Sequence, residues 1–298
     1  MNYNKGIWKT GALAVVVTIA FAIFVFRAAD WVKGFNSEFL VYGQTSGGGG
    51  TIAATGTSGL VTKVIPQIAV GDFGDGTKYT TVIQIINTSS TGITVSGNFY
   101  TQLGAASPVS LRTSTGATIS GGVLSATALN GNSVLVLTSQ PAAGAAPIIA
   151  WGKIVATGAV SIATFFEIRD GINPNILYSR VGVQASPANM ASFIIPRTRN
   201  VSTGLDIAFA LVNTGTAATL NATLRDASGA TISTKSLPLT AGQQTALFTQ
   251  QFFGLTSEPT GTNYHFIVFD GGTAAQFAAI ALAYEGATQT SFPVDQLR

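Results

Sequence analysis

The chain has 298 residues, 46% of them hydrophobic and only 9% charged, and it contains no cysteine. This hydrophobic content is ample for packed cores and excludes a disordered chain, while the lack of cysteine excludes disulfides, thiolate catalysis and cysteine-ligated metal centres. The formal net charge of +3 comes from Lys5, Lys9 and Arg27, because 12 basic residues balance 12 acidic ones from Ala28 onward, and this balance argues against binding to nucleic acid.

Residues 10–26 form an uncharged apolar run of about 17 residues, which would extend about 25 Å as an α-helix. Such a helix satisfies its own backbone hydrogen bonds and nearly spans the hydrocarbon core of a bilayer. Trp8 and Trp31 would lie near the two membrane interfaces, and Arg27, directly after Phe26, can extend its guanidinium toward the headgroups. The run therefore predicts a single N-terminal transmembrane helix.

A cleaved signal peptide is the alternative, because it also has a basic start followed by an apolar region. The apolar run is slightly too long for that role, and no small residue stands three places before a cut at Ala28 or Ala29. We therefore favour an uncleaved anchor in a bacterial cell membrane, with Lys5 and Lys9 in the cytoplasm and the C-terminal bulk periplasmic or extracellular.

The segment after the apolar run carries Trp31, Phe35 and Phe39 at every fourth residue. This spacing predicts a helical extension with one apolar stripe, which would contact membrane lipid or a protein partner. Residues 44–59 then show no apolar periodicity and contain four consecutive glycines, a composition typical of a flexible linker. We assign residues 1–43 to the anchor with its interfacial extension and 44–59 to the linker.

From Leu60 onward the pattern changes to short alternating or apolar runs rich in Val, Ile, Thr and Phe, separated by Gly, Asn and Asp. Such runs are typical of β-strands, and no long helical period occurs beyond the anchor region. The expected strands are 79–86, 93–101, 133–138, 150–157, 161–168, 206–212, 219–225, 244–249, 264–269 and 276–284.

These strands fall into two sets that repeat one unit. Ile65-Pro66 matches Ile195-Pro196, and in each unit a strand then runs into an Asn-Thr turn, at Asn87 and at Asn213. The next strand ends in a Gly-Ala turn, at Gly104 and Gly229 respectively. The repeat predicts two β-sandwich domains, 60–188 and 189–298, with insertions near 107–118 and 140–147 in the first.

About seven short strands per unit suit an immunoglobulin-like antiparallel sandwich. The second unit, with VNTG at 212–215, LRDASGA at 224–230 and LPLTAG at 237–242, resembles Ig-like modules of bacterial surface and secreted proteins. The resemblance covers 194–294 well and 65–183 loosely. It implies an all-β fold of two tandem Ig-like sandwiches and an envelope setting, without implying an activity.

Candidate catalytic residues are few. His265 is the sole histidine and lies in an alternating strand, where a hydrogen-bonded structural role is favoured, and no Gly-x-Ser-x-Gly elbow exists. Glu167 and Asp170 could pair as glycosidase carboxylates, but three residues apart at a strand end they should face different directions. Gly152-Lys153 lacks the remaining residues of a phosphate-binding loop.

Each candidate binding residue also has a structural interpretation. Asp72 and Asp75 could contribute to a calcium loop, but Asp-Gly is also a strong turn signal. Trp151 with the Phe165-Phe166 pair could stack on a sugar, although its apolar strand favours a core position. Arg197 and Arg199 should form a basic cluster in a solvated interdomain loop, where an acidic partner could bind.

These observations favour a non-enzymatic, membrane-anchored structural or accessory protein with no cofactor, metal, catalytic residue or identified small-molecule substrate. Its partners would be membrane lipid and proteins of a membrane complex or of the cell surface. The alternatives are a surface adhesin, filament component or glycan-binding protein and, less favoured, an enzyme whose site is assembled from scattered residues. The residues expected to contact membrane or partner are Trp8, Phe26, Arg27, Trp31, Phe35 and Phe39.

Overall fold

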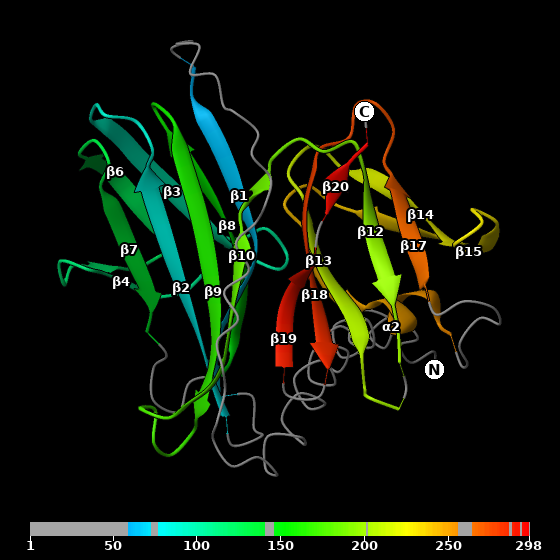
Figure 1. Ribbon diagram of the computed structural model, residues 1–298. Coiled ribbons are helices and arrows are strands. Elements are labelled where there is room, and N and C mark those ends of the chain that lie inside the picture. The colour runs from blue at the N-terminus through cyan, green and yellow to red at the C-terminus, as the bar shows by residue number, and fades with distance from the viewer. Residues whose placement is uncertain are drawn as a thin grey trace, which may run out of the picture.

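The computed structural model describes residues 59–72, 77–140, 146–200, 202–255, 264–285, 288–292 and 294–297. In these ranges the protein is all-β, with the short helix α2 (Thr249–Phe253) between two strands (Figure 1). No helix within them is long and apolar enough to cross a bilayer. The predicted anchor and nearly all of the predicted linker lie outside the described residues.

The first half of the fold contains two facing sheets. Sheet A has the order β6-β3-β8-β1-β11, and sheet B has the order β5-β4-β7-β2-β9-β10; β1 also pairs with β2 at its end, which links the sheets. We call this pair the first sandwich. Its strands are β1 (Val61–Asp72), β2 (Thr77–Asn87), β3 (Ile93–Thr101), β4 (Leu111–Thr113), β5 (Thr118–Ile119), β6 (Val123–Leu129), β7 (Val134–Ser139), β8 (Ile148–Ala156), β9 (Val160–Asp170), β10 (Leu177–Gln184) and β11 (Ser186–Pro187).

The second half repeats this arrangement. Sheet C has the order β16-β13-β18-β19, and sheet D has the order β15-β14-β17-β12-β20. We call this pair the second sandwich. Its strands are β12 (Ser192–Thr198), β13 (Asp206–Asn213), β14 (Ala218–Asp226), β15 (Thr231–Leu239), β16 (Gln244–Phe248), β17 (Tyr264–Asp270), β18 (Phe277–Glu285), β19 (Thr288–Phe292) and β20 (Asp295–Gln296).

The two sandwiches correspond strand for strand, apart from the additional β4–β5 hairpin. Sheet A corresponds to sheet D, and the β7-β2-β9-β10 part of sheet B corresponds to sheet C. A buried asparagine ends the second strand of each unit: the Asn87 amide donates to the Leu129 carbonyl at 3.2 Å, and the Asn213 amide donates to the Leu239 carbonyl at 3.1 Å. The Asn-Thr turns seen in the sequence thus occupy equivalent places.

The strand order agrees with an immunoglobulin sandwich only in part. The central pairs β2–β7 and β3–β8 correspond to the B–E and C–F pairs of that fold. However, β1 runs mainly along β8, and β9 runs along β2, whereas in the immunoglobulin fold the first strand joins B and the last joins F. The Ig-like assignment therefore stays a proposal.

All ten strands expected from the sequence are present, and three that were not predicted, β1, β12 and β15, have a physical reason for their weak signal. In β1, Pro66 lies at a bulge between Ile65 and Ile68, and in β12, Pro196 lies beyond the short stretch that pairs with β20. Proline is tolerated at such positions because no ladder hydrogen bond from its nitrogen is required there. β15 is a largely exposed edge strand with little alternation.

Each sandwich has its own core, and a third apolar cluster joins them. The inward faces of sheets A and B enclose one core, and those of sheets C and D enclose the other. The third cluster lies between sheet C and the side of the first sandwich where β1, β9 and β10 meet. Sheet C is therefore buried on both faces.

Candidate functional site

The seam between the sandwiches is built on one face of sheet C, which we call the outer C face. Alternate residues of β13 and β18 face the core of the second sandwich, and the residues between them face the seam. Many seam residues are alanines, which allow the backbones of the two sandwiches to approach closely. The outer C face consists of Ala208, Ala210, Val212, Ala246, Phe248, Ala278, Ile280, Leu282 and Tyr284.

The first sandwich contributes larger side chains to the seam. Tyr79, Phe166, Ile168 and Val181 are each less than 9% exposed and pack against the outer C face. Burial of such side chains stabilises a protein by about 1.5–3 kcal/mol each. An apolar interface of this kind resists the relative motion that polar contacts between domains usually permit.

Hydrogen bonds fix one end of the seam. The Trp151 indole N–H donates to the Gly242 carbonyl at 2.9 Å, while its ring stacks on Tyr100 with centroids 4.3 Å apart. The turns that hold Gly104 and Gly242 meet here, and a Cβ on Gly104 would lie 3.2 Å from the backbone of Gly242. Trp151 is thus buried, as expected, but it belongs to the junction of the two sandwiches.

Gln244 makes a second set of contacts across the seam. Its side-chain amide donates to the Pro66 carbonyl at 2.9 Å and to Gln67 Oε1 at 3.0 Å. Its backbone N–H donates to the Gln102 carbonyl at 2.8 Å. On the other side, Ser186 Oγ accepts from the Ala279 N–H at 3.1 Å. These bonds set the register of the two sandwiches, which apolar packing alone would leave less specific.

A small cavity lies inside the seam, with a volume of about 30 Å³. It has room for about one or two water molecules and is far smaller than a pocket for an organic ligand. Tyr79, Tyr284, Gln67 and Gln289 contribute the polar groups near it. Burial raises the pKa of the Tyr284 phenol well above its usual value near 10.

This burial predicts a loss of stability at alkaline pH. Above pH 10 the unfolded chain releases the Tyr284 proton while the folded chain retains it, so the free energy of unfolding falls by about 1.4 kcal/mol per pH unit from this group. The Tyr284→Phe variant should lack this contribution. Chemical unfolding of both proteins between pH 8 and 11 measures it, and parallel curves above pH 10 would contradict the prediction.

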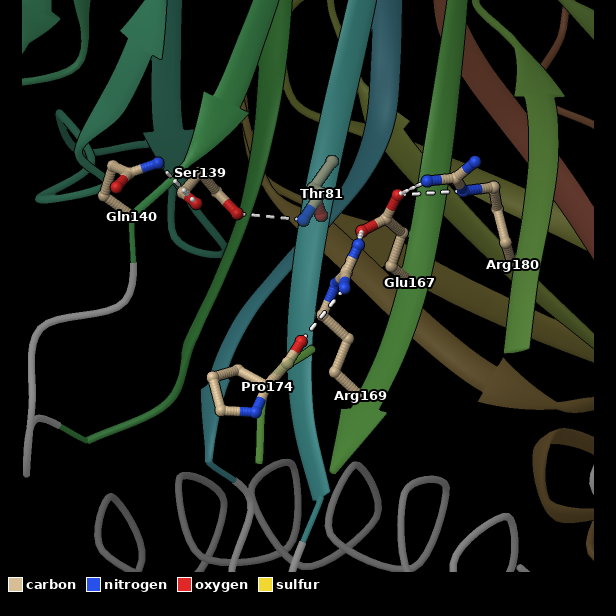
Figure 2. A network of polar contacts seen from close by, with 7 residues as sticks. All are labelled: Thr81, Ser139, Gln140, Glu167, Arg169, Pro174 and Arg180. Atoms are coloured by element: carbon tan, nitrogen blue, oxygen red, sulfur yellow. Dashed lines mark hydrogen bonds and ion pairs between the residues drawn. The ribbon is translucent and has the colours of Figure 1, made fainter. Parts of the chain in front are cut away.

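The outward face of sheet B, which we call the outer B face, corresponds by strand order to the outer C face but is not covered by another described strand or helix. Its charged end is a network around Glu167, whose side chain is only 3% exposed (Figure 2). Arg169 donates to Glu167 Oε2 through Nη2 at 2.6 Å, and Arg180 donates to Oε1 through Nε at 2.8 Å. Arg169 also donates to the Pro174 carbonyl at 3.0 Å.

Asp170 has different partners from Glu167. Its carboxylate accepts from the backbone N–H groups of Ile172 and Asn173 at 2.8 and 2.6 Å and from the Tyr178 hydroxyl. These bonds, with that of Asn173 the strongest, lower the pKa of Asp170. Glu167 is saturated by arginines and Asp170 stabilises the β9–β10 loop, so the two carboxylates do not form a glycosidase pair.

The other sequence candidates occupy structural positions. His265 is buried in β17, opposite Arg197 of β12. The expectation of a solvated loop for Arg197 is wrong: it is 1% exposed and its Nε donates to Thr249 Oγ1 at 2.9 Å. Arg199 follows β12 and its Nε lies 3.7 Å from the Asp206 carboxylate. Both side chains lie too deep for a solvated basic cluster, because Arg197 is on the inward face of β12 and Arg199 is only 11% exposed beside Asp206.

The remaining candidates fall into two groups. Gly152 and Lys153 lie within β8, Phe166 lies in the seam, and Asp72 ends β1. Across the described ranges, no three His, Cys, Asp or Glu side chains gather where they could hold a metal ion. The predicted membrane or partner contacts lie outside the described residues, as does Asp75; they are Trp8, Phe26, Arg27, Trp31, Phe35 and Phe39.

Sequence reasoning missed the seam. A signal for it was present, because residues 207–212 and 277–284 are almost continuously apolar, a pattern typical of strands buried on both faces. The residues missed were Gln67, Tyr79, Gln244, Ile280 and Tyr284.

No family model matches the chain, and no curated protein matches it. Among solved structures, the lectin of Pleurotus ostreatus in its apo form has 10% identity and a TM-score of 0.14, with 80% of this chain and 75% of the lectin covered. The lectin from Pleurotus ostreatus in complex with GalNAc has 10% identity and a TM-score of 0.14, with 80% and 76% covered. Similarity at this level does not establish a shared fold.

Proposed function

We propose that the protein is a non-enzymatic, single-pass structural or accessory protein of a bacterial membrane complex. An N-terminal helix would anchor it, and its two Ig-like sandwiches would form one rigid unit outside the cytoplasm that makes contacts with other proteins. The observation that carries this proposal is the seam, where sheet C is buried on both faces and Trp151 and Gln244 bond across the junction. A unit held in this way transmits position and orientation, which is what a scaffold requires.

The glycan-binding, adhesin or filament role is the second candidate. It is favoured by the outer B face, where Phe165 and several valines remain partly exposed beside the arginines. A displayed binding protein would use such a face without needing other membrane subunits.

The experiment that separates the two candidates is extraction of the full chain from its native membrane in mild detergent, followed by size exclusion and mass spectrometry of what co-migrates. We expect stoichiometric co-migration with other integral membrane subunits. Migration alone, or with copies of itself only, would reject the accessory role in favour of the second candidate.

The same extraction tests the predicted contact residues. If the stripe of Trp31 and Phe35 binds a protein partner, Trp31→Ala or Phe35→Ala should reduce the co-migrating partner by tenfold or more while the chain stays in the membrane. A stripe that contacts only lipid would tolerate both changes. Ser37→Ala, which lies off the predicted stripe, is the matched control.

A further inference from the structure

The outer B face combines an apolar patch with a positive charge. Its patch is formed by outward residues of β2, β7 and β9, all half-buried or exposed, and Val134 is 48% exposed. The charged residues of the face are Lys78, Arg112, Arg169 and Arg180 against two carboxylates, those of Glu167 and of Asp72, which pairs with Lys78 at the end of β1. The patch residues are Val82, Ile86, Val134, Val136 and Phe165.

Glu167 holds two of these cations in place. It is buried and bonded to both Arg169 and Arg180, yet the Arg180 side chain is still 51% exposed. The carboxylate thus orients a guanidinium toward the solvent beside the apolar patch. An ordered arginine loses little conformational entropy on binding a carboxylate, which favours an acidic partner surface.

The outward face of sheet D, which we call the outer D face, has the complementary character. β12 and β17 place an apolar stripe on it, and Tyr264 at one end is 71% exposed. Asp270 and Asp295 are exposed on this face, with Arg225 as its single base, whose Nη1 is bonded to the Gly229 carbonyl at 2.8 Å. The stripe residues are Ile194, Pro196, Tyr264, Phe266 and Val268.

We propose that the outer B face of one copy binds the outer D face of a second copy, so that chains associate head to tail. Three observations support this: the opposite charges of the two faces, the apolar patch on each, and the strand-for-strand equivalence of the outer B face to the outer C face, which packs against a sandwich of this same chain. In a dimer formed by two different faces, one outer B face and one outer D face remain unoccupied. Further copies can bind there, so the assembly grows into rings or filaments.

This inference goes beyond the proposed scaffold role, because it names the partner of two specific faces. It is tested with the purified full chain in mild detergent, without other subunits, so its failure is distinct from failure of the membrane-complex proposal. Molar mass is measured by light scattering with detergent correction over a hundredfold range of protein concentration.

Two substitutions should each block association through one face: Val134→Glu on the outer B face and Tyr264→Glu on the outer D face. We expect each to raise the concentration needed for association by at least tenfold. The matched control is Val123→Glu, because Val123 is 51% exposed and lies on sheet A, away from both faces. It should shift association by less than twofold. Thermal unfolding checks that all three variants fold.

An equimolar mixture of the Val134→Glu and Tyr264→Glu variants gives the decisive result. Each variant keeps one intact face, so at a concentration where neither variant associates alone the mixture should form dimers and no larger species. A parent chain that stays monomeric, association that persists in both variants, or a Tyr264→Glu variant that behaves like the parent would each overturn the inference.

Discussion

Ile280→Asp is expected to lower the free energy of unfolding by about 4 kcal/mol, because it places an unpaired carboxylate inside the seam. Ile280 is 5% exposed and faces the first sandwich beside Leu282 and Phe166. The change should also uncouple the two sandwiches. Denaturant unfolding followed by Trp151 fluorescence and by circular dichroism should then give two transitions in place of one.

The matched control for Ile280→Asp is Ala163→Asp. Ala163 holds the equivalent place in the first sandwich, because it pairs with Gln84 as Ile280 pairs with Ala210. It lies on the outer B face, where water can solvate the new carboxylate, so the loss should stay near 1 kcal/mol. Equal losses at the two positions would show that the seam is not what makes Ile280 sensitive.

Asn213→Ala is expected to destabilise the protein by about 3 kcal/mol. The Asn213 side chain is fully buried, donates to the Thr216 and Leu239 carbonyls at 2.7 and 3.1 Å, and accepts from the Gly215 N–H at 3.0 Å. Alanine leaves the buried Leu239 carbonyl without its partner, at the full desolvation cost of that group, and also removes the two part-buried bonds to Thr216 and Gly215. Unfolding by denaturant measures the effect.

The equivalent asparagine of the first sandwich tests the same prediction a second time, and an exposed asparagine serves as the control. Asn87→Ala should have an effect of similar size, because Asn87 donates to the Thr91, Leu129 and Asn130 carbonyls. Asn221→Ala removes one exposed bond to Ser236 and should change stability by no more than about 0.5 kcal/mol. A loss at Asn213 as small as that at Asn221 would refute the structural role of the buried asparagine.

Local sequence patterns predicted ten of the twenty strands in the described residues. In β2 the side chains alternate between buried and half-buried along the whole strand, and the signal for it in the sequence is a run rich in Thr, Val and Ile. Three of the strands that were not predicted have weak local patterns: β15 is a mostly polar edge strand, and prolines interrupt β1 and β12. Their positions are set by pairing with strands that are distant in the sequence, and a local pattern cannot reveal such pairing.

The candidate sites were predicted less well than the strands. Trp151 was expected to be buried, but its bond to Gly242 joins residues 91 positions apart. Arg197 was expected in a solvated loop, whereas its charge is buried beside Thr249. Neither contact produces a periodic pattern in the sequence, because Gly242 lies in a turn and Thr249 begins α2, each far along the chain from its partner.

The sequence by itself determined the all-β class, ten of the strands and the repeated order of turns, because these depend on alternation and on turn residues a few positions apart. It also predicts a membrane anchor in residues 10–26, outside the described residues. Only the tertiary structure decided which sheet faces are covered. The outer B and outer C faces belong to equivalent sheets, yet no described strand or helix covers the first while the second is buried, because burial depends on the surface that another sandwich presents from far along the chain.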